Sequence, residues 1–180
     1  MVLLDIPSPL HDVFGARQRP LAIVLIVAAA LAVPIAVATA EPQLVTAVAP
    51  WRVAIAALLV ADIAAGAVAN LTAGTNDHYS TRPTARWVFI AVHLHLVAVA
   101  LLLDLPLVPA LIVWTATIGG AVVVNLLRTH PEQRVIGGTF FIAIAAAAVL
   151  VTDVRALAIV GILFAFKVVY AFAVDHTRAS

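Results

Sequence analysis

Long apolar segments, separated by short polar breaks, repeat along nearly the whole chain. Each segment is close to the length of about 20 residues that a helix needs to cross the hydrocarbon core of a membrane. Backbone groups in lipid must be paired within their own segment, so continuous helices are the economical structure. The six predicted spans are 20–40, 51–71, 86–103, 107–127, 136–152 and 154–174.

The breaks between these segments contain residues that end helices. Glu41-Pro42 and Pro50 frame the first break, and Asp104-Leu105-Pro106 separates the third span from the fourth. Proline lacks the backbone N–H that a helix interior needs, so it marks boundaries. We therefore predict an all-α, polytopic membrane protein with a transmembrane domain at 20–174, an N-terminal segment at 1–19 and a tail at 175–180.

Composition supports a membrane protein and excludes several functional classes. Hydrophobic residues make up 64% of the chain and charged residues 11%, whereas a soluble domain has roughly 45–50% and 25%. The absence of cysteine excludes disulfides, thiolate nucleophiles and thiolate metal sites. A net charge of +1 provides no basic surface for nucleic acid. The predicted partners are the lipid bilayer and a small molecule or ion, and a homo-oligomer is left open.

Basic residues in the short loops predict the orientation, because cytoplasmic loops carry the excess of lysine and arginine. With an even number of spans, both termini and the second and fourth loops share one side. Seven arginines fall on that side and two on the other: Arg17, Arg19, Arg82, Arg86, Arg128, Arg134 and Arg178 against Arg52 and Arg155. Both termini are therefore predicted to be cytoplasmic, with the 1–19 segment along the inner membrane surface. The alanine- and valine-rich composition favours a prokaryotic plasma membrane.

The first span also has features of a secretory signal. Arg17 and Arg19 precede an apolar run that ends in Ala38-Thr39-Ala40, which is similar to a signal cleavage site. The run of about 20 residues is longer than the roughly 7–15 of a signal peptide. A retained transmembrane helix is therefore favoured.

Charged residues occur inside two of the predicted spans. Asp62 lies in the second span and Lys167 in the sixth, and at about 1.5 Å per residue their depths differ by only about 3 Å. An ionisable group at mid-bilayer costs about 2.5–3.5 kcal/mol and usually has a partner. We therefore expect an ion pair, which is either a site for a proton, ion or polar solute or a structural link between helices. Asp62, Gly66 and Asn70 recur every four residues and are therefore expected on one helix face, with the small Gly66 at its centre.

The third span contains the tripeptide His93-Leu94-His95. In a continuous helix two such histidines point about 200° apart, so they are predicted to face opposite sides and not to bind one metal ion. Arg86 lies seven residues before His93 and shares its face, which makes His93 the interior-facing histidine. With a typical pKa of about 6.5, its predicted use is proton handling. The sequence identifies no cofactor and no metal site.

The predicted loop at 72–85 contains more polar residues than a connection needs if it only reverses the direction of the chain between two spans. Asp77 beside His78 and Tyr79 is suited to orienting an imidazole, and Arg82 with Arg86 is suited to gripping an anionic head group. His130, in the loop after the fourth span, is a further candidate for the same pocket. The alternative is that the arginines only anchor the topology and the other polar groups are solvated.

Three functional hypotheses follow from these residues. The first is transport or permeation of a small solute or ion through a buried site made by Asp62, Lys167 and His93. The second is a membrane-embedded enzyme or lipid-binding protein with a cytoplasmic pocket at Asp77-His78-Tyr79 and the nearby arginines. The third is a structural or accessory subunit, in which all these polar groups only hold helices together.

Overall fold

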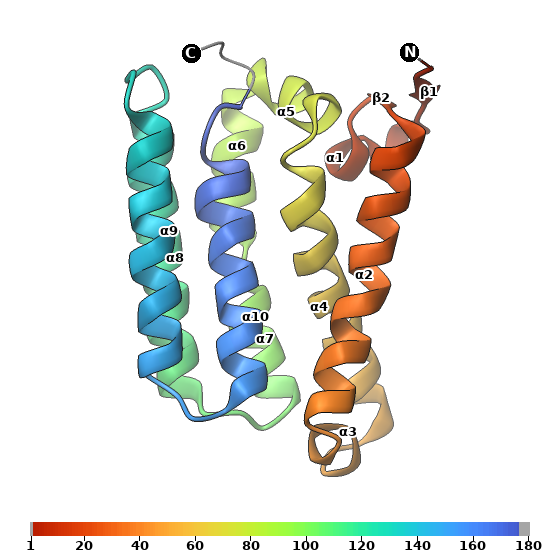
Figure 1. The fold of residues 1–180 in the computed structure, drawn as a ribbon, viewed down its shortest axis with the longest axis vertical. Helices are drawn as coiled ribbons and strands as arrows, with labels where there is room; N and C mark the ends of the chain where they lie inside the picture. Colours follow the sequence, from red (N-terminus) through yellow and green to blue (C-terminus); the bar gives the residue numbers. More distant parts are fainter. Residues whose placement is uncertain (1, 177–180) are drawn as a thin grey trace.

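Six helices, each long and apolar enough to cross a membrane, run side by side in the computed structural model, which describes residues 2–176 (Figure 1). This confirms the predicted all-helical fold and its number of candidate spans. The spans are α2 (Pro20–Ala40), α4 (Pro50–Ala69), α6 with α7 (Pro83–Val92 and His95–Leu102), α8 (Leu107–Leu126), α9 (Gln133–Leu150) and α10 (Arg155–Ala165) with its continuation η2 (Phe166–Phe172).

Proline begins three of these helices. Pro20, Pro50 and Pro83 each occupy the first turn of α2, α4 and α6, where the missing N–H has no intrahelical partner to lose. The prolines that read as breaks in the sequence therefore act as helix starts. A further proline, Pro34, lies in the interior of α2.

The outside of the bundle is apolar, as a lipid-facing surface requires. α2 packs mainly along α4, and Leu21, Val24 and Ile35 on α2 are each more than 60% exposed. The centre is built from α4, α7, α8, α10 and η2, where small residues such as Ala110 and Ala165 are fully buried. Close packing through small residues, with large apolar side chains outside, is typical of helices that associate in lipid.

The N-terminal segment folds against one end of the bundle. Two short strands, β1 (Leu4–Asp5) and β2 (Arg17–Gln18), pair antiparallel, and η1 (Ser8–Leu10) and α1 (His11–Phe14) lie between them. Gly15, at φ 71°, lies so close to α5 that a Cβ there would be 2.0 Å from the carbonyl oxygen of Gly74. Both the N-terminal segment and Ala173–His176 lie at this end, here called the α5 end (Figure 1).

The segment predicted as a loop at 72–85 contains a helix of its own, α5 (Ala73–Ser80). Thr72 caps it, because its hydroxyl accepts a hydrogen bond from the backbone N–H of Thr75. At the opposite end, the short helix α3 (Gln43–Thr46) follows α2, and the Glu41 carboxylate accepts from the N–H of Ala156 at 3.0 Å. Glu41 thereby caps the start of α10 from a distant part of the sequence.

The prediction of a continuous third span is wrong. The helix stops at Val92 and restarts at His95, and the N–H of Leu94 bonds to the carbonyl of Val92 at 2.9 Å. With φ −78° and ψ 75° at His93, this is an inverse γ-turn. The carbonyl oxygen of His93, freed by the break, accepts a hydrogen bond from Trp114 Nε1 at 2.8 Å. The Trp114 indole thus replaces a bond that the helix would have made.

Arg86 fixes the last candidate span at the α5 end. Its guanidinium is 2% exposed and donates to Asn125 Oδ1 at 2.9 Å and to the carbonyls of Phe172 and Ala173 at 3.0 and 2.9 Å. The last carbonyls of a helix have no intrahelical donor and carry partial negative charge, so a buried cation satisfies them well. Arg86 is therefore a structural clamp rather than an exposed loop residue.

Replacing Arg86 by methionine should destabilise the fold strongly. Asn125 Oδ1 and the Phe172 carbonyl would lose their donor, and the Ala173 carbonyl would keep only its bond from Gln133 Nε2. At about 1–3 kcal/mol for each acceptor left without a donor, we expect the unfolding free energy in micelles to fall by about 3 kcal/mol or more. Arg19→Met, at an exposed arginine, serves as control and should change it by less than about 0.5 kcal/mol. Equal effects of the two substitutions would contradict the clamp.

Candidate functional site

The centre of the candidate site is an ion pair between the second and sixth spans. Lys167 Nζ lies 2.5 Å from Asp62 Oδ2 and 3.3 Å from the Asp62 carbonyl oxygen. The contact expected from their equal depth is thus present. The Lys167 side chain is only 3% exposed, whereas the Asp62 side chain is 43% exposed. The cation is therefore enclosed, and the carboxylate is still accessible from outside the protein.

The helices are shaped to admit the lysine. A Cβ on Gly66 would lie 2.3 Å from Lys167 Cε, so only glycine leaves room on α4, one turn after Asp62. Lys167 itself sits in η2, a π-helical stretch in which the N–H of Ala173 bonds to the carbonyl of Val168. Such π-helical segments occur often at functional sites.

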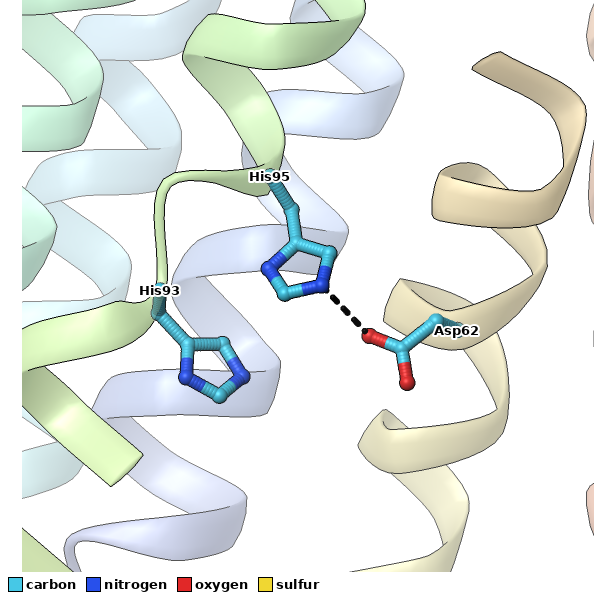
Figure 2. Close-up of side chains that lie close together, drawn as sticks. All are labelled: Asp62, His93 and His95. Carbon is cyan, nitrogen blue, oxygen red and sulfur yellow. Dashed lines mark ion pairs between the residues drawn. The ribbon is translucent and has the colours of Figure 1, made fainter. Parts of the chain in front are cut away.

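Both histidines of the third span join this pair. His95 Nε2 lies 3.2 Å from Asp62 Oδ2, and the rings of His93 and His95 are 4.9 Å apart. Figure 2 shows His95 at the start of α7 and His93 on the link before it, with both rings on the side of Asp62. The prediction that the two rings point to opposite faces is wrong, because the γ-turn at His93 removes the 200° rotation that a continuous helix imposes.

Hydrogen bonds assign the proton on His93. Its Nδ1 lies 2.5 Å from the carbonyl oxygen of Phe89, and because a carbonyl only accepts, Nδ1 must carry the hydrogen. The Nε2 atom of a neutral His93 then carries a lone pair and no hydrogen. It is buried and has no hydrogen-bond partner, and the same holds for His95 Nδ1. Buried polar atoms without partners are uncommon in native proteins and need an explanation.

One ligand atom from each of Asp62, His93 and His95 lies within 4.8 Å of the other two. The Phe89 ring stacks on Phe172 at 3.6 Å between centroids and lies 3.8 Å from the His93 ring, so one side of the cluster is aromatic. The site thus combines one carboxylate, one ammonium and two imidazoles in apolar surroundings. Such a group can bind a cation or a polar solute.

The pocket predicted around the second loop does not form as a single group. Arg86 points into the bundle, and Tyr79 is buried against the Phe89 and Phe172 rings, with its hydroxyl donating to the Asp12 carbonyl at 3.3 Å. Burial raises the pKa of Tyr79 to about 12, so the phenol stays protonated at neutral pH. Arg86 and Tyr79 therefore do not line the cavity that Asp77, His78 and Arg82 share.

The other loop residues line a different cavity. Asp77, His78 and Arg82 face a hollow of about 730 Å³ that they share with Arg17 and Arg19 of the N-terminal segment. His78 lies between Asp12 Oδ1 at 3.1 Å and Arg82 Nη1 at 2.6 Å. The N-terminal arginines were not predicted as site residues, because no local pattern shows that their segment folds over α5.

Three remaining polar candidates have local structural roles. Asn70 is buried at the end of α4, where its carbonyl accepts from the Asn76 side chain. His130 is in the turn between α8 and α9 and accepts from the N–H of Glu132. His176 lies 3.0 Å from the Tyr170 carbonyl. None of these three lies in the group formed by Asp62, Lys167 and the two histidines of the third span.

Comparisons with known proteins do not assign the chain to a family. No protein-family model, no curated protein and no solved structure matches it. Arguments about function therefore rest on the geometry of this chain.

Sequence reasoning missed His95, Phe89 and Trp114 as parts of the site. His95 was set aside because the span was taken as a continuous helix. The break carries no glycine or proline, so the usual signals of an interrupted helix are missing. A contact between distant residues, the Trp114 bond to His93, stabilises the break, and local sequence does not reveal such a contact.

The effect of charge pairing between Asp62 and Lys167 on stability can be distinguished from the effect of side-chain packing. Asp62→Asn leaves the enclosed ammonium of Lys167 unpaired, and removing one partner of a buried pair is costly, so we expect the unfolding free energy to fall by about 3 kcal/mol. Adding Lys167→Met to Asp62→Asn removes the unpaired charge and should recover most of that loss. Thermal and denaturant unfolding in micelles measure both variants. A double variant less stable than the single one would show that the charges are not coupled.

Proposed function

We propose that the protein is a multi-pass membrane protein that moves a small cation through the site formed by Asp62, Lys167, His93 and His95. Six apolar helices support membrane insertion, and the arginine excess at the α5 end supports a cytoplasmic position for that end in a prokaryotic plasma membrane. The cluster then lies near the middle of the bilayer, far from both surfaces. Ionisable groups at that depth are usually functional.

One observation favours this proposed function over a purely structural role for the ion pair. A structural ion pair needs only Asp62 and Lys167, yet the third span is broken and two imidazoles are brought to the pair. His93 Nε2 is a buried acceptor without a hydrogen-bond partner among the described residues. Burying it unpaired costs roughly 1–3 kcal/mol, and a bound cation would remove that cost.

The arrangement suggests how the site stays neutral. With no substrate, the Lys167 ammonium compensates the Asp62 charge. An arriving cation competes for the same carboxylate oxygen, and the imidazole nitrogens replace part of its lost hydration. The protein leaves 43% of the Asp62 side chain uncovered, so there is room for a cation beside the carboxylate. Since two cations cannot share one carboxylate oxygen in apolar surroundings, the Lys167 amine leaves Asp62 or gives up its proton when the ion binds.

Flux measurements in proteoliposomes test this proposal. Cation uptake by the purified full chain should fall to the rate of protein-free liposomes in Asp62→Asn/Lys167→Met, because the carboxylate that attracts the ion is lost while the charge balance is kept. Asp153→Asn is the matched control, since Asp153 lies in the turn before α10, and it should transport at the wild-type rate. Unchanged flux in the double variant would overturn the proposal and favour a structural or accessory subunit.

A second candidate function, binding of an anionic lipid head group, is supported by the cavity at the α5 end. Three arginines, Arg17, Arg19 and Arg82, line it together with His78. Basic groups at the cytoplasmic interface attract anionic lipids, with about 1 kcal/mol for each residue. This binding is compatible with transport and does not require it.

Lipid retention tests the second candidate. Arg19→Ala/Arg82→Ala should lower the amount of anionic lipid that co-purifies, by roughly tenfold, because two interfacial charges are removed. Mass spectrometry of gently purified protein measures the retained lipid. Arg155→Ala, at the other end of the bundle, should retain the wild-type amount. Equal retention in all three proteins would exclude this cavity as the binding site.

A further inference from the structure

We propose that Asp62, His93 and His95 form a binding site for a divalent transition-metal ion of the zinc and cobalt type. The inference rests on the proposed cation site and names its substrate class. Two imidazole nitrogens and one carboxylate oxygen are a ligand set that suits such ions, and three protein ligands leave a position open for water or exchange. Calcium and magnesium prefer oxygen ligands, so this set disfavours them.

The distances are compatible with one ion. Ligand atoms around a zinc ion lie about 2.0–2.2 Å from the metal, which places them roughly 3.3 Å from one another. The three candidate atoms already lie within 4.8 Å, and His95 Nε2 is 3.2 Å from Asp62 Oδ2. The remaining gap is therefore at most about 1.5 Å.

His93 has the hydrogen bonding of a metal ligand. A ligating histidine typically donates its second ring N–H to a carbonyl or carboxylate, which fixes the ring and directs the other nitrogen at the metal. His93 Nδ1 donates in this way to the Phe89 carbonyl at 2.5 Å. His93 is 5% exposed, and its Nε2 is buried without a partner. An enclosed lone pair facing a carboxylate is the independent feature that points to a ligand.

Lys167 is the competitor at this site. Its Nζ lies 2.5 Å from the Asp62 oxygen that faces His95. Two cations cannot share that oxygen without strong repulsion in apolar surroundings. Metal binding therefore requires the ammonium to move off Asp62, and removing the lysine should strengthen binding.

Metal titration of the full chain, purified without a histidine tag and treated with chelator, tests the inference. Cobalt(II) serves as probe, because its visible absorption reports ligand number and geometry, and zinc(II) should displace it. We expect about one ion per chain. Affinity should fall by about tenfold or more in His93→Gln, in His95→Gln and in Asp62→Asn/Lys167→Met. It should rise in Lys167→Met and stay unchanged in His130→Gln, the matched control.

Size-exclusion profiles and thermal unfolding confirm that each variant is folded before it is titrated. Absence of cobalt binding in the wild type would overturn the metal site. Wild-type cobalt affinity in folded His93→Gln and His95→Gln would also overturn it. Weaker binding in folded Lys167→Met would overturn the competition. If the protein binds metal but shows no cation flux, transport is refuted and the metal site is supported. If it transports another cation but binds no metal, only the metal site is refuted.

Discussion

The enclosed charge of Lys167 is the constraint on which the centre of this structure depends. An ammonium without a partner in apolar surroundings is too costly to keep, so the helix carrying it must pack where a carboxylate is available. Asp62 supplies that carboxylate, and Gly66 supplies the space for the lysine stem. The pairing therefore fixes which faces of the second and sixth spans meet. It also determines the depth at which the site lies.

The broken third span follows a similar logic at the level of the backbone. Interrupting a helix in an apolar bundle exposes polar backbone groups, and these must find other partners. Trp114 from α8 donates to the freed carbonyl of His93, and a γ-turn bond closes the link. The result is that two histidines which a regular helix would separate come together beside Asp62. Irregular backbone in membrane-type helices commonly occurs where it lines a site.

Much of the fold was predictable from the sequence, and much of the site was not. The lengths of the apolar segments and the prolines between them determine the candidate spans, and equal depth predicts the contact of Asp62 with Lys167. The break at His93 was not predictable, because it depends on Trp114, which lies in the next span, and not on glycine or proline. Arg86 shows the same limit: its position beside the loop suggested contact with an anionic head group, whereas it donates to the carbonyls of Phe172 and Ala173 at the end of another helix.

The α5 end is connected to this interior through the end of η2. Arg86 clamps the end of η2, five residues beyond Lys167, so a change in the position of that helix end would be transmitted to the lysine through continuous backbone. Phe172 links the same end to Phe89 and, through it, to the His93 ring. The clamp, the aromatic stack and the ion pair are therefore parts of one connected core.

Nitrogen-15 NMR of the lysine ammonium tests the central claim most directly. Lys167 is the only lysine in the chain, so lysine labelling gives a single Nζ signal without assignment. In bilayers the account predicts an ammonium in contact with an aspartate carboxylate carbon. That contact should be absent in Asp62→Asn and should disappear from the wild type when zinc is added. An Nζ signal with no carboxylate contact, or a contact that persists in Asp62→Asn, would contradict the account.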